Sequence, residues 1–170
     1  MRQKNQQFES LVRSFYQSLY RYAYWQCKDK EIAEDLVQET FAKAWKNIEQ
    51  LKSLDSAKPW LFTIINRENA RRFARKQLPM TDLTDEWTIE DIADKSAPLE
   101  KIPLQRAIKK LPTEYREPLI LQIVAGCTTD EIAKIMNLNS NTISTRLHRA
   151  RSFLKDIMCP KTTAGGLHHG

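Results

Sequence analysis

The sequence contains few of the residues that break helices or cross-link chains. Only 4 of its 170 residues are glycine and 3 are cysteine. No stretch alternates apolar and polar residues between turn signals, as strands of a sheet would. Cys27, Cys127 and Cys159 are odd in number and include no CxxC pair, which argues against a disulfide framework or a zinc finger. We therefore expect an all-α protein.

Long apolar runs are also missing. No stretch approaches the roughly 18 apolar residues of a membrane span, and the polar first seven residues do not suggest a signal peptide. We expect a cytoplasmic protein without membrane insertion. No group of histidine, cysteine and carboxylate side chains suggests a catalytic site, so we expect no enzyme activity, metal or cofactor. Cys159, His168 and His169 allow a metal or redox cluster, but a disordered tail is the preferred interpretation.

The net charge of +6 is unevenly distributed. Residues 1–76 hold 15 basic and 9 acidic residues, and residues 101–170 hold 11 and 5. Residues 77–100 between them hold 1 basic and 7 acidic residues. This pattern favours two nucleic-acid contacts and a linker that avoids DNA. We expect an N-terminal domain over 1–76, an acidic linker over 77–100, a C-terminal domain over 101–158 and a tail over 159–170.

Residues 31–48 form a helical pattern with an unusual outer face. Glu31, Asp35 and Glu39 recur every four residues opposite an apolar stripe. Like charges at this spacing repel by roughly 0.2–0.5 kcal/mol per pair, and Lys43 is placed to offset only the last of them. The face is either solvated or presented to a basic partner. Periodicity alone favours the solvated face.

A second helical pattern, over residues 60–77, is apolar at first and basic at its end. Its second half holds Arg67, Arg71, Arg72, Arg75 and Lys76. Three of these arginines are four residues apart and so share one face, and only Glu68 offsets the charge. The pattern favours a phosphate-binding stripe over a merely solvated face. Phe73 is expected in the core rather than stacked on an unpaired base.

Three other helical stretches complete the expected fold. Residues 5–26 carry an apolar stripe rich in aromatic residues, and residues 99–111 form a shorter helix. Another helix is expected to begin with Thr113 as its N-cap and to stop at Gly126.

The segment after residue 127 indicates a helix-turn-helix. Thr128-Thr-Asp-Glu131 is a capping box that opens a short helix. Asn137 suits a left-handed turn, and Asn139 or Ser140 can cap the longer helix that follows. The outward side of that helix should enter the major groove, where Arg pairs with guanine and Asn with adenine. Its outward residues are Asn141, Thr142, Thr145, Arg146, Arg149 and Arg151.

Several of these blocks resemble bacterial sigma factors of the small, two-domain extracytoplasmic-function (ECF) type. The similarity covers nearly the whole chain, from about Phe8 to Met158. It is carried by AEDLVQETFAKAW (33–45), PWLFTI (59–64), LPTEYREPL (111–119) and ISTRLHRARSFL (143–154). The resemblance implies a factor that binds core RNA polymerase and directs promoter recognition and transcription initiation, in a stress or envelope response.

The resemblance also assigns roles to residues. It implies that an acidic face docks on a coiled coil of the largest polymerase subunit, namely Glu34, Asp35, Gln38 and Glu39. It implies that a loop and helix of the first domain read the minus-ten element and hold a flipped base, through Lys52, Ser56, Lys58, Asn66, Arg67, Arg71, Arg72, Arg75 and Lys76. The C-terminal helix-turn-helix would then read the minus-thirty-five element.

The chain departs from the family pattern at three places, one of them Arg71, which stands where relatives usually carry Asp. Arg67 stands where relatives usually place Asn, and Ser144 stands where many carry Lys. In the family the linker threads the RNA-exit path of the polymerase, and Trp87, Ile89 and Ile92 could anchor it there. Many relatives are held inactive by an anti-sigma factor, and this chain is compatible with such a partner.

A stand-alone helix-turn-helix regulator is the main alternative. Such a protein would bind DNA tightly without polymerase. It would leave the acidic helix and the basic stripe without a purpose.

Overall fold

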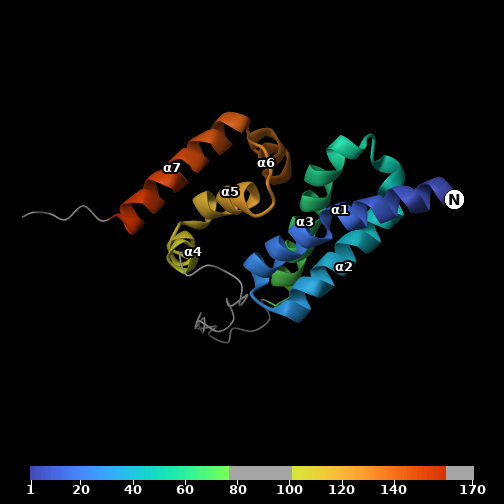
Figure 1. Cartoon of the computed structure of the whole chain (residues 1–170), viewed down its shortest axis with the longest axis horizontal. Helices are drawn as coiled ribbons and strands as arrows, with labels where there is room; N and C mark the ends of the chain where they lie inside the picture. Colours follow the sequence, from blue (N-terminus) through green and yellow to red (C-terminus); the bar gives the residue numbers. More distant parts are fainter. Residues whose placement is uncertain (77–100, 160–170) are drawn as a thin grey trace, which may run out of the picture.

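The chain, in a computed structural model, is described over residues 1–76 and 101–159, and these residues form helices without any strand (Figure 1). The expected all-α class is therefore confirmed. The predictions for the linker residues Trp87, Ile89 and Ile92, and for His168 and His169, lie outside the described residues. In the described part of the chain, no helix is both long and apolar enough to cross a membrane.

The N-terminal half contains three long helices with two single turns of 3-10 helix before the third. The elements are α1 (Arg2–Cys27), α2 (Lys30–Asn47), η1 (Ile48–Gln50), η2 (Leu54–Ser56) and α3 (Ala57–Lys76). The short break between α1 and α2 has a local cause. Lys28 takes a left-handed conformation with φ of 61°, and the Asp29 side chain accepts a hydrogen bond from the Ile32 N–H at 3.0 Å.

The C-terminal half contains α4 (Lys101–Lys109), α5 (Thr113–Ile123), α6 (Thr129–Met136) and α7 (Ser140–Met158). Thr113 was expected to be an N-cap but is the first residue of α5, and Pro112 occupies the cap position without a side-chain hydrogen bond. The fixed backbone of Pro112, with φ of −53°, brings the chain into the helix there. Helix α5 ends at Ile123, and Gly126 lies in the turn beyond it with φ of +64°.

The helix-turn-helix caps agree with the sequence prediction. Thr128 accepts from the Glu131 N–H at 3.2 Å, and Glu131 accepts from the Thr128 N–H at 2.8 Å. Asn137 takes φ of 53° at the end of α6, and Asn139 caps α7 by accepting from the Asn141 N–H at 2.7 Å. Thr128 and Glu131 therefore fix the start of α6, whereas Asn137 and Asn139 shape the turn between α6 and α7.

The two halves share one hydrophobic core. Helix α3 contacts α1 and α2 on one side and α6 on the other, so the halves pack directly together (Figure 1). Leu61 and Phe62 of α3 are fully buried in the same cluster as Ile132 of α6. Tyr22 of α1 packs edge-on against Phe62, with ring centroids 5.3 Å apart. Burial of this kind stabilises by about 1.5–3 kcal/mol per large side chain.

The capping box offers a direct test of the helix-turn-helix. Replacing Thr128 with Ala removes the hydroxyl that accepts from Glu131, so the free energy of unfolding should fall by about 1 kcal/mol. Thr128→Ser keeps the hydroxyl and serves as the control. Urea unfolding followed by circular dichroism measures both. Equal midpoints for the two variants would show that the cap contributes nothing.

Candidate protein-binding and nucleic-acid interfaces

The acidic face of α2 is fully presented to solvent. Glu34, Asp35, Gln38 and Glu39 are exposed, while the opposite side of α2 is buried in the core. Within the described residues, none of these three carboxylates forms an ion pair. The face is therefore a rigid row of negative charge without local compensation.

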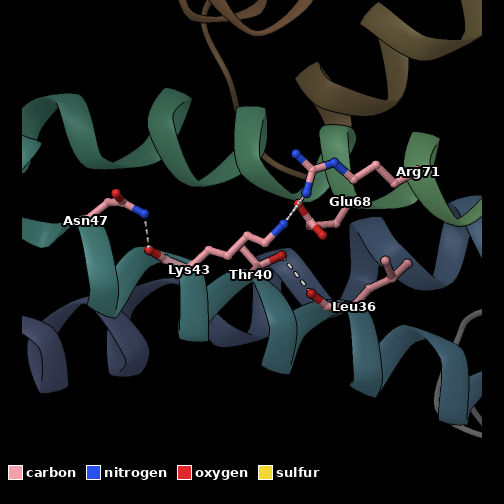
Figure 2. Close-up of polar contacts among 6 residues, drawn as sticks. All are labelled: Leu36, Thr40, Lys43, Asn47, Glu68 and Arg71. Carbon is pink, nitrogen blue, oxygen red and sulfur yellow. Dashed lines mark hydrogen bonds and ion pairs between the residues drawn. The ribbon is translucent and has the colours of Figure 1, made fainter.

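Lys43 does not offset Glu39, contrary to the sequence expectation. Its ammonium instead pairs with Glu68 of α3 (Figure 2). The Glu68 side chain is only 8% exposed and also lies 3.5 Å from the Arg71 guanidinium. A carboxylate buried to this extent needs a partner, because removing an unpaired charge from water is costly. Lys43 satisfies that need and so leaves the acidic face uncompensated.

A polar network, which the sequence analysis did not anticipate, joins α1 to α3. The Tyr22 hydroxyl donates to Asn66 Oδ1 at 2.7 Å, and Gln26 Nε2 donates to the same oxygen at 3.1 Å. Asn69 Nδ2 donates to Gln26 Oε1 at 2.9 Å. Burial raises the pKa of Tyr22 well above its ordinary value, so the phenol stays neutral and remains a donor. Asn66, a predicted minus-ten residue, is half-buried and engaged in this network.

The signal for this network was present in the sequence. Tyr22 and Gln26 are four residues apart in α1, and Asn66 and Asn69 are three apart in α3, so each pair shares a helix face. Two such polar pairs on helices that pack together can meet.

The basic stripe of α3 is exposed along most of its length. Arg67, Arg71, Arg75 and Lys76 are exposed, and Arg72 is half-buried. Arg71 is partly held by Glu68 but keeps 63% of its side chain in solvent. The core prediction for Phe73 is wrong, since its side chain is 52% exposed. It lines a hollow of about 490 Å³ with Trp25, because the end of α3 faces α4 and α5 across this space.

The loop before α3 places its candidates in different surroundings. Lys52 is exposed, whereas Ser56 is half-buried and donates to the Ser53 carbonyl at 2.8 Å. Lys58 reaches the C-terminal half, where its ammonium donates to the Gly126 carbonyl at 2.5 Å and lies 3.9 Å from Glu131. Lys58 already lies in the first turn of α3, so it is the start of this helix that contacts the helix-turn-helix.

Helix α7 is oriented by its apolar side. Ile143, Leu147 and Ala150 are buried, which turns the predicted recognition residues outward. Asn141, Thr145, Arg149 and Arg151 are exposed, and Thr142 and Arg146 are half-buried.

Two of these arginines also touch α5. Arg149 donates to the Tyr115 hydroxyl at 3.4 Å, and Arg151 donates to Gln122 at 2.5 Å. Both side chains are therefore tied to α5 by one hydrogen bond each.

Comparison with known proteins agrees with this arrangement. Residues 11–79 match the Sigma-70 region 2 family, and residues 101–154 match the Sigma-70 region 4 family. The chain is 34% identical over 140 residues to RNA polymerase sigma factor SigV of Bacillus subtilis (strain 168), covering 82% of this chain and 83% of that protein. It is 33% identical over 128 residues to ECF RNA polymerase sigma factor EcfG of Rhodopseudomonas palustris (strain TIE-1), covering 74% and 71%.

Two solved structures are similar in fold. The sigma factor RpoE, in complex with the anti-sigma factor NepR from Bartonella quintana, gives a TM-score of 0.66 at 22% identity and covers 95% of this chain and 99% of that one. CnrH, in complex with the cytosolic domain of CnrY, gives 0.65 at 23% identity and covers 91% and 88%.

A three-helix domain with an exposed acidic helix, joined to a helix-turn-helix domain, defines a two-domain sigma factor. The chain belongs to the ECF group of bacterial RNA polymerase sigma factors, which direct transcription initiation.

The buried carboxylate of Glu68 provides a second stability test. In Glu68→Gln the neutral amide leaves Lys43 without its counter-charge, so the free energy of unfolding should fall by about 1–3 kcal/mol. Glu49→Gln breaks the pair with Lys4, in which the Glu49 side chain is 84% exposed. It should change stability by less than about 0.5 kcal/mol. Urea unfolding compares the two, and equal losses would refute the structural role of Glu68.

Proposed function

We propose that the acidic face of α2 is the surface through which this sigma factor binds core RNA polymerase. The observation that carries the proposal is the exposure of Glu34, Asp35 and Glu39 on a helix whose other side is fully packed. Like charges in one row repel, and a partner of opposite charge would relieve that repulsion. The docking coiled coil should therefore present Lys and Arg side chains.

The rigidity of α2 supports this role. Leu36, Val37 and Phe41 anchor it in the core, and the Lys43–Glu68 pair ties it to α3. A surface held in its binding conformation loses little conformational entropy on association. The charges are therefore presented at fixed spacing to the polymerase.

We also propose that two basic surfaces divide promoter recognition between them. The α3 stripe and the preceding loop would contact the minus-ten element, with exposed Arg67, Arg75 and Lys76 on phosphates. The outward side of α7 would enter the major groove at the minus-thirty-five element, where Arg146 and Asn141 can read base edges. The protein assembles a complex and performs no covalent chemistry.

Complexes of proteins with a similar fold support a proposal about regulation. RpoE is described in complex with an anti-sigma factor, NepR. We propose that this chain acts in the cytoplasm and is controlled by a protein of the same class.

The polymerase-docking proposal is tested by charge reversal. The double variant Asp35→Lys and Glu39→Lys should weaken binding to core polymerase roughly 100-fold, because two attractive contacts become repulsive. The matched control is Glu9→Lys with Asp156→Lys, which makes the same change in net charge at two exposed positions elsewhere. Fluorescence anisotropy with labelled protein measures both affinities, and circular dichroism checks folding. Normal polymerase binding by the first variant would refute the assignment.

The promoter proposal is tested on α7. Arg146→Ala with Arg149→Ala should reduce transcription from a minus-thirty-five-dependent promoter at least tenfold, since each bidentate base contact contributes about 1–3 kcal/mol. Core polymerase binding should not change. Lys110→Ala with Lys134→Ala removes two exposed cations of the same domain and should leave transcription nearly intact. If both pairs of substitutions reduced transcription equally, the assignment of α7 to the minus-thirty-five element would be refuted.

A further inference from the structure

Three tyrosines form a stacked row along α1. Tyr16, Tyr20 and Tyr24 are four residues apart and so share one side of the helix. The ring centroids of Tyr16 and Tyr20 lie 6.4 Å apart, with 8° between the ring planes. Those of Tyr20 and Tyr24 lie 6.3 Å apart, with 19° between the planes. We call these residues the tyrosine row, and its stacked rings hold one another in a fixed orientation.

The tyrosine row lies at the edge of the core rather than within it. Tyr16 is 38% exposed, and Tyr20 and Tyr24 are half-buried. Leu19 and Tyr22 form the buried side of α1 instead. Aromatic rings that remain partly in water are enriched in protein–protein interfaces, because they offer a large apolar surface with a polar hydroxyl. The exposed part of the row is therefore suited to a protein partner.

The tyrosine row also continues the acidic face of α2. Helix α1 packs against α2 (Figure 1). Burial raises the pKa of the Tyr20 phenol, and the negative charge of Glu34 acts in the same direction. This influence places Glu34, a member of the acidic face, close to the middle ring of the row. The carboxylates and the rings thus form one surface that extends from α2 onto α1.

A surface of carboxylates beside aromatic rings favours one kind of cation. The planar guanidinium of arginine pairs with carboxylates and stacks on rings, whereas the ammonium of lysine is compact and more strongly hydrated. The chain already has a contact between a cation and a ring elsewhere, since Lys4 Nζ lies 5.1 Å from the Trp45 ring centroid. In the part of the chain that the structure describes, no cation lies over the ring of Tyr16 or Tyr20. These two rings are therefore available to a partner.

We propose that the tyrosine row is a second part of the polymerase-binding surface and receives arginine side chains of the docking coiled coil. This second contact rests on the proposed function, because the same polymerase element must reach both helices. The acidic face attracts any cation, and salt screens that attraction. The rings add apolar contact, which salt does not screen, and select a planar cation. The row would therefore contribute specificity where the carboxylates contribute attraction.

The tyrosine row is tested at Tyr16, its exposed member. Tyr16→Leu removes the ring and should weaken binding to core polymerase about 3- to 10-fold. Tyr16→Phe keeps the ring and should bind like the wild type. Phe73→Leu, which removes a 52% exposed ring at the end of α3, should also bind like the wild type. Fluorescence anisotropy with the labelled full chain measures the affinities, and circular dichroism checks folding.

The dependence of affinity on salt separates the ring from the charges. Tyr16→Leu should shift the plot of log Kd against log salt concentration without changing its slope. Glu34→Gln removes a screened charge and should reduce the slope. Tyr20→Leu and Tyr20→Phe repeat the comparison at the middle of the row. Wild-type binding by Tyr16→Leu, or an equal loss in Tyr16→Phe or Phe73→Leu, would overturn the role of the row.

The contributions of the two parts of the surface can fail separately. If Tyr16→Leu weakens polymerase binding while the Asp35 and Glu39 reversals do not, the assignment of the acidic face is wrong. If the reversals weaken binding while Tyr16→Leu binds like the wild type, the assignment of the tyrosine row is wrong.

Discussion

Helix α3 is packed on both sides, and this constraint organises the whole molecule. Its apolar residues serve the core of the first domain and also the surface that meets α6. Its polar residues are divided in the same way. Asn66 and Asn69 bond toward α1, Glu68 holds Lys43 of α2, and Lys58 reaches the helix-turn-helix. One helix thereby couples the acidic face, the basic stripe and the recognition helix.

The division of charge follows from these pairings. Lys43 lies four residues beyond Glu39, and its pairing with Glu68 removes one cation that could have offset the acidic face. The Glu68 carboxylate also pairs with Arg71. The charge of Arg71 is therefore partly offset within α3, and the other cations of the basic stripe supply most of its positive charge. A single buried carboxylate thus pairs with cations from both α2 and α3, between the acidic face and the basic stripe.

Much of the fold was predictable because its signals are local. The capping box at Thr128, the left-handed Asn137 and the cap at Asn139 each depend on residues within four positions, and all three occur as expected. The exposure of Glu34 and Arg149 likewise follows from helical periodicity. The misassigned residues depend on other helices. Phe73 lines a hollow that it shares with residues of α4 and α5, and Lys43 is paired because α3 supplies Glu68. The periodicity of a single helix cannot predict contacts that depend on where another helix packs.

The left-handed residue between α6 and α7 limits which sequences can keep this architecture. Asn137 holds φ of 53° where a branched side chain would clash with its own backbone. Glycine and aspartate are the substitutes that tolerate such a conformation. Any other residue would favour a different direction for the helix that follows. The outward side chains of α7 can therefore vary without changing the turn, while the direction of the helix depends on one small polar residue at position 137.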